Sequence, residues 1–209
     1  DGIQLNWIRN CQDLEKFDLI ILPGSKQTIK DINFLKETGL IKNIRDYSKR
    51  DGNILGICGG LQMLGEFLED PYCKEGLDSS QKELIKGIGL LPLKTIFKKT
   101  KITKRIICDS TWPLETKVEG FEIHNGITEI IKREREEKLK NIFKQNQLGW
   151  YLDNKERGSI AGVYLHGLFE NDHWRISYLN LIRDKKGIQI LDKKYKPYKI
   201  KREAIINNL

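Results

Sequence analysis

Residues 53–65 read Asn-Ile-Leu-Gly-Ile-Cys-Gly-Gly-Leu-Gln-Met-Leu-Gly, and they contain the clearest structural signal in the sequence. The apolar run Asn53–Ile57 predicts a buried strand, and Leu61–Leu68 predicts a helix. Glycines on both sides of Cys58 allow a turn that is too sharp for residues with a Cβ atom. The pattern therefore predicts a tight strand-to-helix turn with Cys58 at its apex.

A cysteine in this position is suited to act as a nucleophile. The N-terminus of a helix favours the thiolate over the thiol, which makes Cys58 a competent attacker near neutral pH. The backbone N–H of Gly59 would face the oxyanion that forms during attack. The alternative is a buried structural cysteine beside a glycine-rich turn. Glycines on both sides of the cysteine favour the nucleophile.

The strand before this turn places a second loop beside it. Asp18–Leu22 predicts a strand that ends at Pro23-Gly24-Ser25-Lys26, and a long helical stretch follows to Arg50. This alternation predicts an α/β fold with an open, mostly parallel, flavodoxin-like sheet flanked by helices. Functional residues are commonly found at the carboxyl ends of parallel strands, where both the Pro23–Lys26 loop and Cys58 are expected. Gly24 would therefore bring a second backbone N–H close to Cys58. An ordinary turn glycine is the alternative for Gly24.

Beyond Pro71 the pattern changes to short strand-like pieces that predict a more antiparallel region. These pieces are Gly89–Phe97, Lys101–Cys108 and Lys117–His124. Residues 132–147 are highly polar and predict a surface excursion of helix or mobile loop. At the start of the chain, the run Ile3–Ile8 is strand-like.

Three histidines are available as acid–base groups. His166 ends a predicted strand and is followed by a glycine, His124 also falls at a strand end, and His173 falls in the first turn of a helix. A single histidine is more often structural than catalytic. The position of His166 at a strand end makes it the candidate partner of Cys58.

Composition limits the class of protein. The length of 209 residues predicts one domain spanning 1–209. The net charge is +8, but the basic clusters contain no interleaved aromatic residues of the kind that bind nucleic acids. No apolar run approaches the ~20 residues needed to span a membrane. The four cysteines lie far apart, which predicts no disulfide framework and no metal site. Reduced thiols and a cytoplasmic location are expected.

Six segments, in order along the chain, resemble class I, triad-type glutamine amidotransferases, and more closely the cobyric acid synthase branch. They are Leu-Pro-Gly-Ser-Lys (22–26), Gly-Ile-Cys-Gly-Gly-Leu-Gln-Met-Leu-Gly (56–65), Leu-Glu-Asp-Pro (68–71), Gly-Ile-Gly-Leu-Leu-Pro-Leu (87–93), Gly-Phe-Glu-Ile-His-Asn-Gly (120–126) and Tyr-Leu-His-Gly-Leu-Phe-Glu-Asn-Asp (164–172). The resemblance implies a glutaminase in which Cys58 and His166 are catalytic. It also implies that Gln62 contacts glutamine and that His124 binds glutamine or lines the exit toward a partner domain.

The resemblance further implies a partner domain. Ammonia would pass to an N-terminal ATP-dependent synthetase domain that amidates the corrinoid adenosylcobyrinic acid a,c-diamide in cobalamin biosynthesis. The chain has no Gly-x-x-x-x-Gly-Lys-Ser/Thr motif, so it is expected to be a fragment lacking that domain. ATP and magnesium would belong to the synthetase, and no cofactor is expected here.

One position departs from the triad pattern. Many of these enzymes carry a glutamate two residues after the histidine, and Leu168 stands there instead. Glu170 or a backbone carbonyl could orient the His166 ring.

Three alternative functions remain open. They are the glutaminase of cobyrinic acid a,c-diamide synthase, a glutaminase that amidates a cell-wall lipid precursor, and a catalytically silent docking module on the same scaffold. Ile57 precedes the cysteine where the first of these usually has a glutamate, and intact Cys58 and His166 argue against the last.

Overall fold

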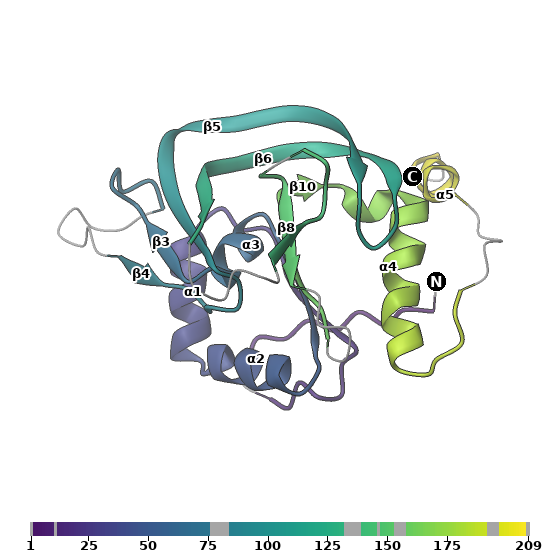
Figure 1. Ribbon diagram of the computed structural model, residues 1–209, viewed down its shortest axis with the longest axis horizontal. Coiled ribbons are helices and arrows are strands. Elements are labelled where there is room, and N and C mark those ends of the chain that lie inside the picture. Colours follow the sequence, from purple (N-terminus) through teal and green to yellow (C-terminus); the bar gives the residue numbers. More distant parts are fainter. Residues whose placement is uncertain are drawn as a thin grey trace.

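The computed structural model describes residues 2–10, 12–75, 84–131, 139–145, 147–152, 158–191 and 197–207. Within these residues the chain forms two five-stranded sheets that are packed with helices (Figure 1). The strand β2 and the consecutive strands β9 and β10, which lie much further along the chain, position the candidate active site at the junction of the two sheets.

The first sheet has the strand order β1-β2-β9-β8-β7. Its strands β1, β2 and β9 are parallel, whereas β8 and β7 are added antiparallel at one edge. The predicted α/β sheet is therefore confirmed, with its parallel part confined to three strands. The strands are β1 (Leu19–Leu22), β2 (Asn53–Ile57), β7 (Leu139–Asn141), β8 (Gly149–Leu152) and β9 (Ile160–Val163).

The second sheet has the order β10-β6-β5-β3-β4 and forms the predicted antiparallel region. Its centre is the long hairpin β5–β6, which arches across the top of Figure 1. The separate short strands expected here are instead two long strands with one register shift between Ile96 and Lys101. The strands are β3 (Phe67–Glu69), β4 (Ile85–Lys86), β5 (Leu93–Ser110), β6 (Thr116–Ile130) and β10 (Leu165–His166).

Two apolar clusters hold these layers together. One cluster joins β1 and β2 to α1 and α3 through residues such as Ile29, Ile54 and Leu61. The other joins β2 and β9 to α4 through Leu55, Val163 and Trp174. The helices are α1 (Thr28–Glu37), α2 (Leu40–Lys49), α3 (Gly59–Leu64), the 3₁₀ turn η2 (Leu168–Glu170), α4 (Asp172–Lys185) and α5 (Tyr198–Ile206).

Two helix predictions are wrong in their bounds. The helical stretch to Arg50 is divided into α1 and α2 at Gly39, whose φ of 75° is left-handed and suits a residue without a Cβ. The helix predicted to reach Leu68 ends at Leu64, because the chain beyond Gly65 turns into β3 and pairs with β5. Helix periodicity alone could not reveal that pairing.

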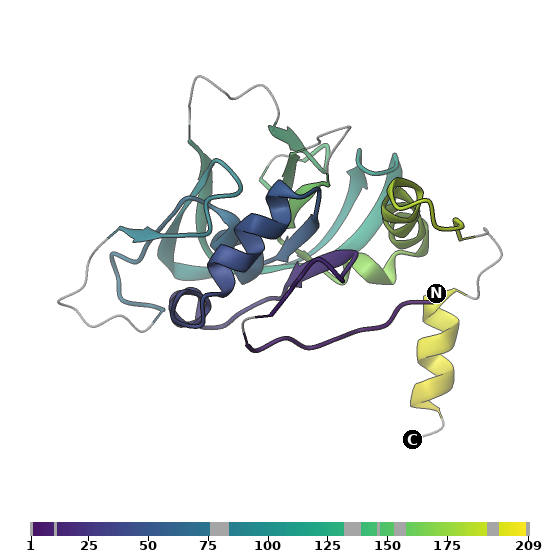
Figure 2. The same ribbon diagram turned by 90° about the horizontal axis from the view of Figure 1, so that it is seen from below.

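Two further predictions need correction. Residues 2–9 contain no regular secondary structure and run extended along one side of the molecule, so the strand expected at Ile3–Ile8 is wrong (Figure 2). The polar segment 132–147 is partly core: β7 pairs with β8, and Ile142 and Phe143 are buried. Residues 132–138 and 146 of that segment lie outside the described residues.

Candidate active site

Cys58 lies at the strand-to-helix turn that the sequence predicts. It is the N-cap residue of α3 and has φ 53° and ψ −108°, a region that L residues rarely adopt. Strain of this kind costs about 1–3 kcal/mol and is retained where the surroundings enforce it. The backbone N–H of Cys58 donates to the Val163 carbonyl oxygen at 2.7 Å, which ties the turn to β9.

The glycines around Cys58 are required by close packing. A Cβ at Gly60 would overlap the carbonyl oxygen of Leu22, and a Cβ at Gly56 would lie 2.6 Å from the Gly60 carbonyl carbon. A Cβ at Gly59 would lie 2.8 Å from the Ser25 Cβ. The turn therefore brings β1, β2 and α3 into backbone contact, which only residues without a side chain allow.

The Cys58 thiol is buried against β6. It donates to the Ile123 carbonyl oxygen at 3.2 Å. Burial raises the pKa of Cys58 above its ordinary value, and the Glu75 charge adds to this effect. The Gly59 N–H and the Lys101 charge act in the opposite direction. Burial is the largest of these influences on the pKa of Cys58, and its ionisation as a nucleophile stays a prediction.

The His166 imidazole contacts the same backbone oxygen as the Cys58 thiol. Its Nε2 lies 3.2 Å from the Ile123 carbonyl oxygen, so the imidazole and the thiol converge on one backbone atom. Gly24 closes this group, because a Cβ built there would lie 3.4 Å from His166 Cε1 and 3.8 Å from Cys58 Cβ. The structure therefore brings together Cys58, His166, Gly24 and Gly59, as the strand-end argument predicts.

Gln62 lies one helical turn after Cys58 and is buried rather than exposed. Its Nε2 donates to the Asn125 carbonyl oxygen at 2.9 Å and to the Tyr164 hydroxyl at 3.2 Å. Its Oε1 accepts from the Thr28 hydroxyl at 3.3 Å. The amide thus links α3 to α1, β6 and the segment between β9 and β10. Contact between Gln62 and substrate stays a prediction.

Tyr164 and His124 form a buried layer behind Gln62. The Tyr164 hydroxyl lies 2.5 Å from Thr128 Oγ1, and burial raises the pKa of Tyr164 to about 12. His124 stacks on Tyr164 with ring centroids 3.7 Å apart, and its Nε2 lies 3.0 Å from Glu122 Oε1. Burial lowers the pKa of His124. His124 lies within β6 and not at a strand end, and its proposed substrate role stays a prediction.

The sequence reasoning missed two groups of this site. One is the main-chain oxygen of Ile123, which no side-chain pattern could signal. The other is Glu75, whose Oε2 accepts the Thr28 N–H at the start of α1 at 2.5 Å. Asp70, within the Leu-Glu-Asp-Pro segment, accepts the N–H of Glu75 at 2.7 Å and holds the turn in place. Burial raises the pKa of Glu75.

The loop after His166 is fixed by side chains of its own. Asn171 Nδ2 donates to the carbonyl oxygens of Gly167 and Glu119 at 3.2 and 2.9 Å, and its Oδ1 accepts the Glu119 N–H. Glu170, a predicted candidate for orienting the His166 ring, forms an ion pair with Arg202 of α5 at 3.2 Å. The other candidate is a backbone carbonyl, and the Ile123 carbonyl oxygen lies within hydrogen-bonding distance of His166 Nε2.

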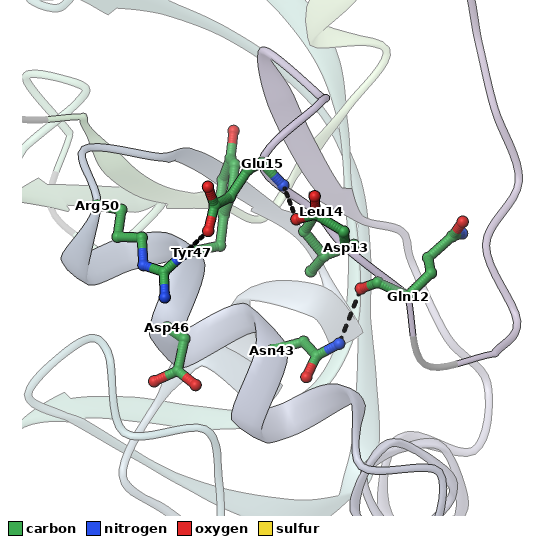
Figure 3. A pocket seen from close by; sticks show the side chains of 8 residues that line it. All are labelled: Gln12, Asp13, Leu14, Glu15, Asn43, Asp46, Tyr47 and Arg50. Carbon is green, nitrogen blue, oxygen red and sulfur yellow. Dashed lines mark hydrogen bonds and ion pairs between the residues drawn. The ribbon is translucent and has the colours of Figure 1, made fainter.

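A pocket of about 200 Å³ lies elsewhere, between residues 12–15 and α2 (Figure 3). In it, Asn43 Nδ2 donates to the Gln12 carbonyl oxygen at 2.8 Å, and Arg50 forms an ion pair with Glu15. No cysteine, histidine or serine is among its lining residues, and none of them belongs to β2, α3, β6 or β10. We assign it no chemistry.

Among the residues that the structure describes, no three His, Cys, Asp or Glu side chains converge into a metal donor set. No described helix is long and apolar enough to cross a membrane. Cys58, Cys73 and Cys108 are free cysteines, and Cys11 lies outside the described residues.

A nucleophile turn after β2 of the α/β sheet, with a histidine beside it at the end of β10 of the second sheet, is the arrangement expected of a class I glutamine amidotransferase. A solved structure described as a glutamine amidotransferase shares this fold, with a TM-score of 0.60, 12% identity, and coverage of 90% of this chain and 88% of that chain. The chain belongs to the CobB/CobQ-like glutamine amidotransferase domain family, whose model matches residues 2–174.

Two relatives show how far the similarity extends. A cobyric acid synthase of Prochlorococcus marinus strain AS9601 is 58% identical over 208 residues, and one of strain NATL2A is 42% identical over 208 residues. Each alignment covers 100% of this chain and 41% of the relative. The chain thus spans about two fifths of the length of these relatives.

Proposed function

We propose that this chain supplies ammonia to a cobyric acid synthase of which it is the C-terminal, glutamine-hydrolysing part. The observation that carries the proposal is the convergence of the Cys58 thiol and the His166 imidazole on the Ile123 carbonyl oxygen. A nucleophile and a base that share one hydrogen-bonding position can exchange a proton once substrate displaces that contact. The similarity to full-length cobyric acid synthases supports the acceptor.

In the first half of the reaction, Cys58 attacks the carboxamide carbon of glutamine. A bond forms from Sγ to that carbon, and His166 takes the thiol proton. The N–H groups of Gly59 and Gly24 hold the negative oxygen of the tetrahedral intermediate. The C–N bond then breaks, the His166 proton goes to the leaving nitrogen, and ammonia departs. A γ-glutamyl thioester remains on Cys58.

In the second half, water hydrolyses the thioester. His166 accepts a proton from the water, the hydroxide adds to the carbonyl carbon, and the same two N–H groups hold the oxyanion again. The C–S bond breaks, glutamate leaves and Cys58 regains its proton. Acid–base catalysis of this kind contributes roughly 10²–10⁴-fold, and one oxyanion donor contributes on the order of 10²–10³-fold.

The remaining parts of the proposal concern the longer protein. ATP and magnesium act in an N-terminal synthetase portion, which amidates carboxylates of adenosylcobyrinic acid a,c-diamide with the ammonia. Glutamine hydrolysis itself needs no cofactor. The free cysteines Cys58, Cys73 and Cys108 support a cytoplasmic location, where thiols stay reduced.

The test uses the full-length protein and three readouts: glutamate release, glutamine-dependent amidation and ammonia-dependent amidation. We expect Cys58→Ser to lower the first two by about 10³-fold or more and to leave the third intact. Cys73→Ser, which changes a free cysteine outside the turn, is the matched control and keeps all three. Glutamate release at the wild-type rate by Cys58→Ser would overturn the nucleophile assignment. Amidation of cobyrinic acid in place of its a,c-diamide would overturn the acceptor.

A further inference from the structure

One face of the second sheet carries His166 together with a lysine that the reaction above does not use. In the register of the sheet, His166 lies opposite Phe121, and Lys101 lies opposite Asn125. Directly opposed residues in antiparallel strands point to the same side, as do residues two apart on one strand. Phe121 and Asn125 are four apart on β6, so the side chains of His166 and Lys101 share this face.

The nucleophile lies against the same stretch of β6. Cys58 Sγ contacts the Ile123 carbonyl oxygen at 3.2 Å, and Gln62 Nε2 contacts the Asn125 carbonyl oxygen at 2.9 Å. Asn125 is the register partner of Lys101, so Lys101 lies across one strand from this edge. Its positive charge also opposes the burial that raises the pKa of Cys58, which is consistent with an ammonium close to the thiol.

Among the described residues, Lys101 lacks the acidic partner that several of its basic neighbours on β5 have. Three of those neighbours are held in ion pairs across the sheet: Lys94 with Glu69 at 2.7 Å, Lys104 with Glu122 at 2.9 Å and Arg105 with Glu119 at 3.0 Å. Lys99 lies over the Tyr72 ring. Lys101 is exposed and forms no ion pair with a carboxylate in the part of the chain that the structure describes. Its ammonium is therefore available to a ligand.

Glutamine presents a carboxylate at the end of the molecule opposite its reacting carboxamide. A site that aligns the carboxamide with Cys58 therefore gains from a cation about one substrate length away. We propose that Lys101 binds the α-carboxylate of glutamine and sets the specificity of the site for a substrate with that group. This inference rests on the proposed glutaminase function, to which it adds a substrate-binding residue on β5.

The first experiment measures glutamate release by the full-length protein with Lys101→Met, Lys101→Arg and Lys99→Met. We expect Lys101→Met to raise the KM for L-glutamine about 10- to 100-fold, with a much smaller effect on kcat. This factor corresponds to the binding free energy lost with one charged hydrogen bond. Lys101→Arg restores most of the affinity because it keeps the charge. Lys99→Met removes the same charge from the same strand and leaves KM unchanged.

The second experiment replaces glutamine with γ-aminobutyramide, which has the carboxamide and the amino group but no α-carboxylate. Release of ammonia from this amide should be equal in wild type and Lys101→Met. An equal loss on both substrates would overturn the inference and assign Lys101 to the ionisation of Cys58. An unchanged KM for glutamine in Lys101→Met would also overturn it. Failure of the proposed function looks different, since the wild-type protein would then release no ammonia from glutamine.

Discussion

The turn at Cys58 and the hairpin β5–β6 contribute to the same site by different means. At the turn, backbones approach so closely that a side chain at Gly56, Gly59 or Gly60 would collide with a neighbouring segment. The hairpin instead contributes main-chain oxygens, those of Ile123 and Asn125, which contact Cys58 and Gln62. The turn thus depends on residues that have no side chain. The contribution of the hairpin depends on the register in which its strands pair.

The largest expected effect tests the turn. Gly60→Ala would place a Cβ against the Leu22 carbonyl oxygen, a backbone atom that has no room to move. We expect a loss of about 3 kcal/mol or more in the free energy of unfolding, measured by urea denaturation. Gly24→Ala is the control, because its Cβ would meet nothing closer than 3.4 Å. Equal stability of the two variants would contradict the role given to close packing at the turn.

The next prediction tests the hairpin through the polar layer that fixes it. Tyr164→Phe removes a hydroxyl that contacts Thr128 Oγ1 and Gln62 Nε2, and both groups are buried. Leaving them without this partner should cost about 1–3 kcal/mol of stability. The glutaminase kcat should also fall because Gln62 loses one of its three contacts. Tyr72→Phe, on an exposed tyrosine, should change neither quantity.

Both the turn and the hairpin affect the pKa of Cys58, so titration of this thiol compares their influence directly. Burial and the Ile123 carbonyl favour the thiol, so its pKa lies above the ordinary value of 9.0. Below that pKa the thiolate fraction, and with it the rate of alkylation by iodoacetamide, rises about tenfold per pH unit. The same titration of Cys58→Ser subtracts the contribution of the other cysteines. A midpoint below 9.0 would mean that the helix N-terminus outweighs burial.

The smallest expected effect concerns the loop after His166. Asn171→Ala removes the bonds that join this loop to Glu119 on β6, which should cost about 1–2 kcal/mol of stability. Because these bonds position His166, we expect a lower kcat with little change in the KM for glutamine. Asn43→Ala, which removes an asparagine bond at the remote pocket, should leave kcat unchanged. A purely structural role for Asn171 would lower stability and leave kcat intact.

Local features of this chain could be predicted from its sequence, whereas its long-range contacts could not. The turn, the strand end at His166 and the proximity of Gly24 could be predicted, because glycine spacing and strand ends are local signals in the sequence. The buried surroundings of Gln62 could not be predicted, because its amide bonds to residues 63 and 102 positions away along the chain. Helix periodicity carries no information about such distant neighbours.

The errors have the same origin. The helix predicted to end at Leu68 ends at Leu64 because β3 pairs with β5, and residues 142–143 are buried because β7 extends the first sheet. In both cases tertiary pairing overrides local composition. The strand expected at Ile3–Ile8 is alternating and apolar, but no described strand pairs with it.

Residue types and their spacing predict a cysteine that glycines hold at a strand-to-helix turn, a histidine at a second strand end, and with them the class of amidotransferase. The surroundings of these residues depend on tertiary contacts instead. The Ile123 oxygen lies 65 residues from Cys58 along the chain, and Lys101 shares a sheet face with His166 because it pairs with Asn125. Local sterics can be read from residue types, whereas contacts between distant strands depend on a register that only the packed sheet fixes.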